Sequence, residues 1–425
     1  MTTYRATDRR KLLAIAQQYG VAKDFGLELD AVSRVFPLRA NRYVLEHLID
    51  WDNIPDDPMF RLVFPQPEML PKAHLDRLCD AIRRESTEDE ISNLVREIRL
   101  ALNPHPADQT TLNIPRVGQQ SLAGIQHKYH ETVLFFPSQG QTCHAYCTYC
   151  FRWAQFVDLP EFKIASTEVS RLVDYLEQHP EVSDVLLTGG DPLIMRTKLL
   201  RRYLEPLLEV DTVSTIRIGT KALSWWPGRF VTDADADDLL DLFDDVIACG
   251  KHLALMAHLT HPRELSTVRA RQAVARVRGT GAVIRAQAPL VRHINDHAEV
   301  WAEMWREQVK LGIVPYYMFI PRDTGARRYF EVPLVLAHQI YKEAISQVSG
   351  LARTARGPSM STSPGKVVID GPAKVAGEDV LAMRFLQARN PQHVHRPFFA
   401  KYDEAATWLD DLRPAFGAQR FFFEE

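Results

Sequence analysis

The stretch TCHAYCTYCFRW, residues 142–153, decides the fold and much of the chemistry of this chain. Its three cysteines, Cys143, Cys147 and Cys150, follow the spacing C-x3-C-x2-C. Three thiolates on one short loop can hold three irons of a cubane [4Fe–4S] cluster and leave the fourth iron open for a ligand from outside the protein. A zinc site needs a fourth protein ligand, and His144 is too close to Cys143 to chelate comfortably beside it. The spacing therefore favours an iron–sulfur cluster.

Short apolar runs begin just before this loop and recur as far as residue 320, with helix-length amphipathic segments between most of them. This alternation predicts a parallel sheet whose strands are buried on both faces. Six strand–helix units are two short of a closed barrel, so we expect an α/β fold built on a partial (β/α)6 barrel. Functional groups should then lie at the C-terminal ends of the strands. The runs are TVLFFPS (132–138), DVLLTGG (184–190), TIRIGTK (215–221), HLALMAHL (252–259), VIRAQAPLV (283–291) and VPYYMFI (314–320).

The rest of the chain divides around this core. Residues 1–130 carry apolar residues at three- and four-residue spacing and are predicted to be mostly helical. Residues 131–330 are predicted to form the barrel, and residues 331–425 a short mixed region. That last region contains the Gly/Pro/Ser-rich segment RGPSMSTSPGK (356–366), which we expect to be irregular and to lead into a strand.

Composition narrows the class of protein. The 425 residues include 51 Lys and Arg and 54 Asp and Glu, a balance that argues against nucleic-acid partners and a polybasic membrane anchor. The apolar runs are too short to span a membrane, and the N-terminus shows no signal peptide. Five cysteines, an odd number, argue against a disulfide framework, and we interpret Cys79 and Cys249 as buried core thiols. We predict a cytoplasmic protein.

A three-cysteine loop after the first strand of a six-unit barrel resembles the radical S-adenosylmethionine (SAM) superfamily. There the amino and carboxylate groups of SAM chelate the open iron, and reductive cleavage gives a 5′-deoxyadenosyl radical that abstracts hydrogen. The resemblance implies that Tyr149 lies near the adenine, and that Gly189, Gly190 and Asp191 of LLTGGDPL bind the amino group of SAM. Glycines let the backbone approach a ligand, and an acid pairs with an ammonium.

Over residues 110–370 the resemblance narrows to the lysine 2,3-aminomutase family. DVLLTGGDPL, IRIGT, HLTHPREL, AQAPLVRHIND and VPYYMF follow in that family's order. The resemblance implies an isomerase, with Gln287 near SAM and Arg152 on the carboxylate of the substrate, where a planar guanidinium suits a bidentate contact. It also implies an electron donor, such as flavodoxin or ferredoxin, and a homo-oligomer.

The chain departs from the family at its pyridoxal phosphate (PLP) motif. Family aminomutases bind PLP as a Schiff base to a lysine in a PGGGGK stretch, and the same interval here reaches Lys366. The residues before Pro364 are SMSTS rather than glycines, and side chains hinder a close backbone approach to phosphate. The family's phosphate-binding arginines correspond to Lys128 and Thr132, so one cation is altered and the other lost. Lys366 is the candidate catalytic and PLP-binding residue.

The substrate pocket departs as well. Two aspartates that bind the distal ammonium of lysine in the family correspond to Arg322 and Ser359, although Asp323 directly follows Arg322. With Arg322 as the match, the pocket favours a distal carboxylate, because burying like charges together is costly. We therefore expect hydrogen abstraction from a carboxylated small molecule, in a 2,3-aminomutase-type isomerisation of an amino acid other than lysine.

Two alternatives stay open. A PLP-independent radical SAM enzyme, such as an epimerase, a lyase or another mutase, would keep the radical machinery and account for the altered glycine stretch. A three-cysteine iron–sulfur or zinc protein for binding or electron transfer would leave Tyr149, Asp191 and Gln287 without a role. Binding of PLP distinguishes the first alternative from the aminomutase, and SAM cleavage distinguishes the second.

Overall fold

The computed structural model describes residues 6–7, 9–19, 23–157 and 160–424. Part of the N-terminal segment in which the sequence shows no signal peptide, residues 1–5, 8 and 20, lies outside the described residues. None of the described helices is long and apolar enough to cross a membrane.

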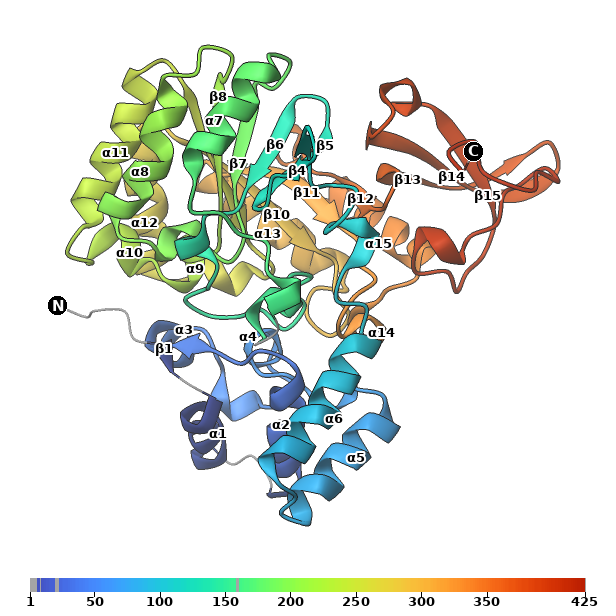
Figure 1. Cartoon of the computed structure of the whole chain (residues 1–425). Coiled ribbons are helices and arrows are strands. Elements are labelled where there is room, and N and C mark those ends of the chain that lie inside the picture. The colour runs from blue at the N-terminus through green and yellow to red at the C-terminus, as the bar shows by residue number, and fades with distance from the viewer. Residues whose placement is uncertain (1–5, 8, 20–22, 158–159, 425) are drawn as a thin grey trace.

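An eleven-stranded sheet forms the centre of the molecule, in the order β15-β14-β13-β12-β11-β10-β9-β8-β7-β6-β5 (Figure 1). Six consecutive strands pair in parallel and coincide with the six apolar runs of the sequence. The sheet is open at its two ends, so the predicted partial barrel is confirmed. The six strands are β6 Thr132–Phe135, β7 Asp184–Leu187, β8 Thr215–Thr220, β9 His252–His258, β10 Val283–Pro289 and β11 Val314–Phe319.

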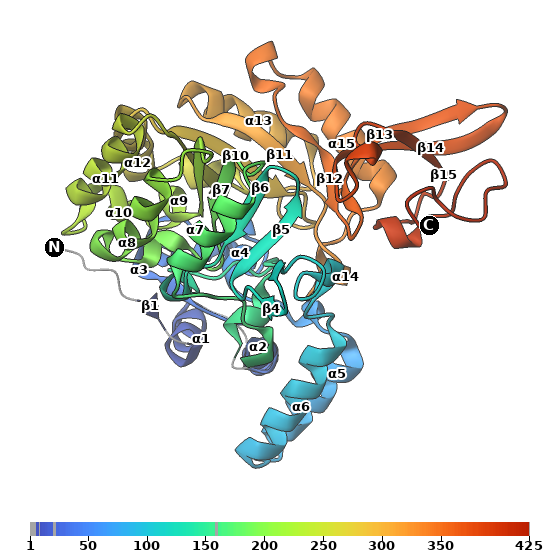
Figure 2. The ribbon, with the colours of Figure 1, turned by 45° about the horizontal axis from the view of Figure 1, so that its top comes forward.

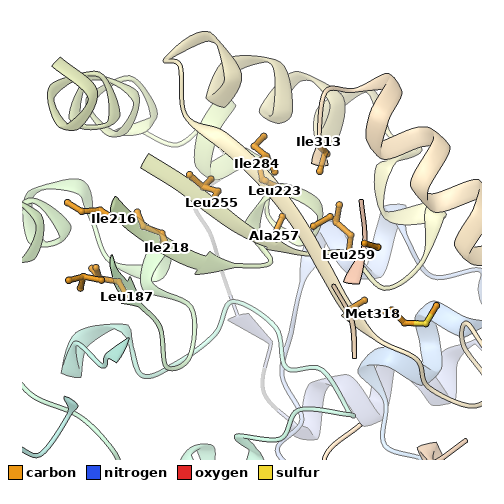
Figure 3. Packing of buried hydrophobic residues seen from close by; sticks show 14 of the residues in the cluster. Leu187, Ile216, Ile218, Leu223, Leu255, Ala257, Leu259, Ile284, Ile313 and Met318 are labelled. Atoms are coloured by element: carbon orange, nitrogen blue, oxygen red, sulfur yellow. The ribbon is translucent and has the colours of Figure 1, made fainter. Parts of the chain in front are cut away.

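Helices follow these strands and cover one face of the sheet (Figure 1). Strand β8 shows the reason: Ile216 and Ile218 are buried toward the helices, while Arg217 between them points to the opposite face. Figure 3 shows this packing of aliphatic side chains, and each such side chain contributes roughly 1.5–3 kcal/mol when fully buried. The helices are α7 Val169–Gln178, α8 Thr197–Leu208, α9 Ala222–Trp225, α10 Gly228–Val231, α11 Ala236–Ala248, α12 Val268–Gly279, α13 Ala298–Lys310 and α15 Leu334–Ser346. Helix α14 Arg327–Phe330 packs instead against the N-terminal region, because Tyr329 and Phe330 are buried with its apolar side chains.

The N-terminal helices form a second core with the cysteine loop. Ala145, Trp153 and Ala154 of the loop region are buried among apolar side chains of these helices. Helices α5 and α6 extend away from the sheet as a pair (Figure 2). The helices are α1 Arg9–Gln18, α2 Lys23–Val35, α3 Arg42–His47, α4 Pro58–Val63, α5 Lys72–Arg83 and α6 Glu88–Ala101.

The sheet extends beyond the six-strand core on both sides. Strand β12 pairs in parallel with β11, and β5 pairs antiparallel with β6. The segment expected to be irregular is thus a seventh parallel strand. Gly357 permits this, because a Cβ there would lie 2.5 Å from the Met318 carbonyl oxygen. The other strands are β1 Ala6–Thr7, β2 Ala40–Asn41, β3 Arg116–Val117, β4 Gln120–Ser121, β5 Ile125–Tyr129, β12 Arg356–Ser361, β13 Gly365–Val375, β14 Glu378–Ala388 and β15 Pro397–Lys401.

The two isolated cysteines differ from each other. Cys79 is buried in α5, as predicted. Cys249 is exposed, so its interpretation as a core thiol is wrong. It caps the C-terminal end of α11, one residue beyond the helix, where the chain turns toward solvent.

Candidate active site

The three loop cysteines lie between β6 and a short 3-10 helix at Trp153–Phe156. Burial raises the pKa of all three thiols, to about 12 for Cys147, and the neighbouring sulfurs of Cys150 and Cys147 raise that of Cys143 further. Metal ligation requires thiolates, so a bound iron would replace these protons. Within the described residues, no group of three or more His, Cys, Asp or Glu side chains can hold a single metal ion. Each cysteine that binds a [4Fe–4S] cluster ligates a different iron, so a cubane does not require the three thiols to meet at one metal ion.

The backbone of the cysteine loop is held by the N-terminal region. The Tyr146 amide donates to the Arg39 carbonyl at 2.9 Å, and the Thr148 amide donates to the Leu62 carbonyl at 3.0 Å. The Arg39 guanidinium also donates to the Thr142 hydroxyl at 2.9 Å. The N-terminal region, which the sequence predicted only as mostly helical, therefore fixes the position of the candidate metal ligands.

Gly189 and Gly190 let the loop after β7 approach the cysteine loop. A Cβ on Gly190 would lie 2.4 Å from the Thr142 carbonyl oxygen, and one on Gly189 would lie 2.2 Å from the Gln141 side chain. Gly189 also has a φ of 134°, which side-chain-bearing residues rarely adopt. The glycines that the resemblance implied for SAM thus have a packing reason to be glycine.

Asp191 lies at the centre of a buried hydrogen-bond network, with 3% of its surface exposed. Its carboxylate accepts hydrogen bonds from the Thr220 hydroxyl and the Lys221 amide at 2.9 Å and from the Leu193 amide at 3.0 Å, and it lies 3.2 Å from His144 Nε2. Burial alone would raise the pKa of Asp191, but the hydrogen bonds from His144, Lys221 and Thr220 outweigh it and lower the pKa. The carboxylate therefore joins the cysteine loop to the loops after β7 and β8.

Tyr149 and Gln287 contact residues that the sequence analysis did not single out. The Tyr149 hydroxyl lies 2.8 Å from the Thr260 hydroxyl, and Gln287 Nε2 lies 3.0 Å from His258 Nε2. Burial, followed by the charge of Lys221, lowers the pKa of His258 to about 4. His258 and Thr260 are recognisable in hindsight, because they end a strand in HLALMAHLT.

Lys221 and Glu264 form a buried ion pair beside the cysteine loop. Lys221 Nζ lies 2.6 Å from Glu264 and 3.1 Å from the His258 carbonyl oxygen. Lys221 is the neighbouring charge that most lowers the pKa of Cys147. Sequence reasoning missed this pair, although the lysine follows β8 directly.

Arg152 and Arg322 both lie over the ring of Phe151, the residue that follows the third cysteine. Their guanidinium carbons are 4.8 Å and 4.4 Å from the ring centroid. Arg152 is 7% exposed, and its Nη1 is buried without a hydrogen-bond partner. Within the described chain, neither guanidinium forms an ion pair with a carboxylate. Asp323 instead accepts a hydrogen bond from the Asn103 side chain at 3.2 Å, so Arg322 is the residue of the two that faces Phe151.

Lys366 is enclosed by aromatic side chains at the start of β13. Its Nζ lies 4.2 Å from the ring centroid of Tyr317 and 5.5 Å from that of Phe319, and it donates to Gln387 at 3.1 Å. Burial, with the charges of Arg356, Arg217 and Arg322, lowers the pKa of Lys366 to about 7.

A further cation, Lys128, lies near Lys366. Burial and the charges of Arg322, Arg389 and Lys366 lower the pKa of Lys128 to about 6, and its Nζ donates to the Thr362 carbonyl oxygen. Arg389 donates to the Ser363 carbonyl oxygen at 2.9 Å. These two cations therefore hold the hairpin between β12 and β13, which replaces the family's glycines.

Thr132 and Ser359, which correspond to a phosphate-binding arginine and a substrate-binding aspartate of the family, lie away from these cations. The Thr132 hydroxyl donates to Asp184 at 3.5 Å, and Ser359 is buried with its hydroxyl 3.5 Å from the Met318 carbonyl oxygen. The structure thus brings together the cysteine loop, Asp191, Tyr149 and Gln287 as one group. Arg322 connects the remaining candidates, because its charge lowers the pKa values of Arg152, Lys128 and Lys366.

Comparison with known proteins gives relatives over most of the chain. A putative L-lysine 2,3-aminomutase of Aquifex aeolicus (strain VF5) is 32% identical over 384 residues, which is 90% of this chain and 90% of that protein. A glutamate 2,3-aminomutase of Clostridioides difficile (strain 630) is 26% identical over 210 residues, 49% of this chain and 47% of its own. No family model matches.

Among solved structures, a radical SAM methyltransferase from Sphaerobacter thermophilus is similar to this chain. It covers 85% of this chain and 95% of its own length, at 13% identity and a TM-score of 0.36. That score is too low to support an argument about the site.

Proposed function

Because this chain belongs to the lysine 2,3-aminomutase family of radical SAM enzymes, we propose that it isomerises an amino acid that carries a second carboxylate. Family membership makes the chain an enzyme of the aminomutase kind, with a [4Fe–4S] cluster and SAM as cofactors. The acidic substrate and the residues assigned below are the proposal.

The pair of guanidiniums on Phe151 carries the proposal. Arg152 is buried and Arg322 is partly buried, and neither has a carboxylate partner among the described residues. A guanidinium binds a carboxylate through two parallel hydrogen bonds, so two of them suit a substrate with two carboxylates. A lysine substrate would bring its ammonium toward Arg322, and that repulsion in a buried site disfavours lysine. Arg152 would hold the α-carboxylate and Arg322 the distal one.

The cysteine loop and its neighbours fit the iron–sulfur cluster and SAM. When bound and reduced, these cofactors supply a radical that removes a hydrogen atom from the substrate. Cys143, Cys147 and Cys150 would hold the irons, with Tyr149 and Gln287 beside SAM. Phe136 and Phe151, on which the Arg152 guanidinium lies, exclude water from the substrate carboxylate.

The residues around Lys366 fit PLP. When bound, PLP supplies a conjugated system that allows nitrogen to migrate between neighbouring carbons. Lys366 would hold it through its amine, which has no acidic partner and is enclosed by aromatic rings. Lys128 and Arg322, whose charge lowers the pKa of Lys128, would counter the charge of the phosphate.

One observation favours the PLP-independent alternative. Lys128 and Arg389 both donate to carbonyl oxygens of the hairpin at Thr362 and Ser363, where the family has glycines. A phosphate would have to compete with these bonds. A PLP-independent radical SAM epimerase, lyase or other mutase on the same scaffold would bind no such phosphate, so these hydrogen bonds could stay in place.

Turnover of candidate substrates tests the proposal. The anaerobically reconstituted enzyme, with SAM, PLP and a chemical reductant, is incubated with glutamate, aspartate or lysine, and the amino-acid products are separated by mass spectrometry. We expect an isomerised product from an acidic amino acid. Arg322→Gln should lower kcat/KM at least about tenfold, mainly through KM, because it removes a charged hydrogen-bonding partner. Arg384→Gln, which removes an outer arginine paired with Asp370, is the matched control. Preferential turnover of lysine would refute the acidic substrate.

Borohydride trapping separates the two radical SAM functions. A single pyridoxyl adduct on the peptide containing Lys366, absent in Lys366→Ala, supports the aminomutase. SAM cleavage without an adduct on Lys366 supports the PLP-independent enzyme.

The remaining expectations stay proposals. We propose that flavodoxin or ferredoxin donates the electron and that the chain assembles into a homo-oligomer. We also propose a cytoplasmic location, because a cluster with an open iron needs a reducing compartment.

A further inference from the structure

Arg356 and Lys366 lie over the same aromatic ring. The Arg356 guanidinium carbon is 4.2 Å from the Tyr317 centroid, and Lys366 Nζ is 4.2 Å from the same centroid. Arg356 also lies 4.3 Å from the Tyr316 centroid, and its Nη2 is buried without a hydrogen-bond partner. Two basic side chains thus share the Tyr317 ring, and no carboxylate in the described chain is paired with either one.

The other groups around Lys366 do not neutralise this charge. Arg217 on β8 is already paired with Asp184 at 2.7 Å. Gln387 on β14 offers Lys366 an uncharged oxygen. The titratable and charged groups that face Lys366 are Arg217 from β8, Lys128 and Tyr129 from β5, Tyr317 from β11, Arg322 after β11 and Arg356 from β12.

We propose that Arg356 is a positioning residue that keeps the Lys366 amine in its neutral, nucleophilic form. A guanidinium remains charged at all ordinary pH values, so it acts as a fixed positive charge. A fixed positive charge beside a buried amine disfavours the ammonium form. Among the neighbouring charges, that of Arg356 contributes most to lowering the pKa of Lys366. The Tyr317 ring places the Arg356 guanidinium and the Lys366 amine beside each other, because both lie 4.2 Å from its centroid.

The chemical consequence is a lysine ready to attack a carbonyl carbon near neutral pH. The amine nitrogen forms the new bond to carbon, and the carbonyl oxygen leaves as water with the two protons of the amine. An ammonium has no free electron pair for this step. The inference rests on the proposed function only in naming PLP as the carbonyl compound, because the state of the amine does not depend on PLP.

Pulse labelling with formaldehyde and cyanoborohydride measures the amine directly, without PLP. The full-length protein is labelled for short times between about pH 6 and pH 10.5, and methylation is read by peptide mass at Lys366 and at exposed Lys72. The ratio of the two rates cancels the reagent's own pH dependence. In the unchanged protein we expect half-maximal labelling of Lys366 near pH 7, well below the ordinary range of lysine side chains at about pH 10.4.

Two variants of Arg356 separate its charge from its packing. Arg356→Gln should move the Lys366 midpoint upward by about one pH unit, which lowers labelling at pH 7 about fivefold. Arg356→Lys keeps the charge and should leave the midpoint close to that of the unchanged protein. An unmoved midpoint in Arg356→Gln, equal shifts in both variants, or a Lys366 midpoint equal to that of Lys72 would overturn the inference. If the Lys366 midpoint shifts as expected but borohydride trapping gives no pyridoxyl adduct, the role of Arg356 is supported and only the PLP part of the proposed function is refuted.

Discussion

Replacing Asp191 with Asn tests whether this carboxylate holds the site together before any ligand binds. One carboxylate oxygen accepts from the Leu193 amide, and the other accepts from the Lys221 amide and lies nearest to His144. The Thr220 hydroxyl donates to both oxygens. In the amide side chain one oxygen becomes an NH2 group, which can accept nothing. Either orientation therefore leaves one backbone N–H facing another donor.

The size of the destabilisation follows from this backbone N–H group, which is left without an acceptor. A buried donor without an acceptor costs about 1–3 kcal/mol. Loss of the charge adds to this cost, because the remaining bonds are no longer charge-assisted. We expect Asp191→Asn to lower the free energy of unfolding of the ligand-free protein by about 2–4 kcal/mol.

Urea denaturation followed by tryptophan fluorescence measures this loss. Asp245→Asn is the control, because Asp245 is exposed and pairs with Arg201 at 2.8 Å, so its loss should change stability by less than about 0.5 kcal/mol. If Asp191 served only to bind SAM, Asp191→Asn would weaken SAM binding and leave the stability of the SAM-free protein unchanged. An Asp191→Asn protein as stable as the Asp245→Asn control would therefore refute the structural reasoning.

Two further predictions concern the same loops and Lys366. Gly190→Ala should destabilise the protein by at least about 3 kcal/mol in urea, since its Cβ would meet the Thr142 carbonyl at 2.4 Å, whereas Gly279→Ala, with open space around it, should be neutral or stabilising. The free energy of unfolding should rise from about pH 7 to pH 10. In this range the Lys366 side chain is protonated in the unfolded chain but neutral in the native protein, where its pKa is about 7. Lys366→Met should reduce that slope by about 1.4 kcal/mol per pH unit, and an unchanged slope would contradict the buried neutral amine.

The sequence predicted those parts of the fold that depend on apolar runs. DVLL and TIRI are strands because their side chains are buried against helices, and this pattern is local. Strand β12 was missed because glycine, proline and serine are poor strand formers. Its strand conformation comes from close packing of Gly357 on Met318 and from pairing with β11 and β13, which no local pattern records.

For the site, the sequence predicted candidate residues but not the contacts that hold them in place. Whether Arg322 or Asp323 faces Phe151 depends on the course of one loop, which the spacing leaves open. The two glycines of GGD were interpreted through a ligand, whereas their closest neighbours are Gln141 and Thr142. Lys221 and Glu264 lie 43 residues apart and meet only in the fold, so neither was recognised as part of the site.

Basic side chains around Lys366 could bind an anionic ligand even though the glycines of the PLP motif are replaced. Glycines bring backbone N–H groups to a phosphate, and they are one of two ways to bind it; charged side chains are the other. Where this chain lacks the glycines, the charges of Arg322 and Lys366 lower the pKa of Lys128, and the charge of Arg322 lowers the pKa of Lys366. Burial first, and then these neighbouring cations, lower the pKa values of Lys128 and Lys366, and Asp108 opposes the effect only at Lys128. An entering dianion would reverse this effect and draw protons back onto Lys128. A cluster of basic side chains arranged in this way fits an anion that comes from outside the chain.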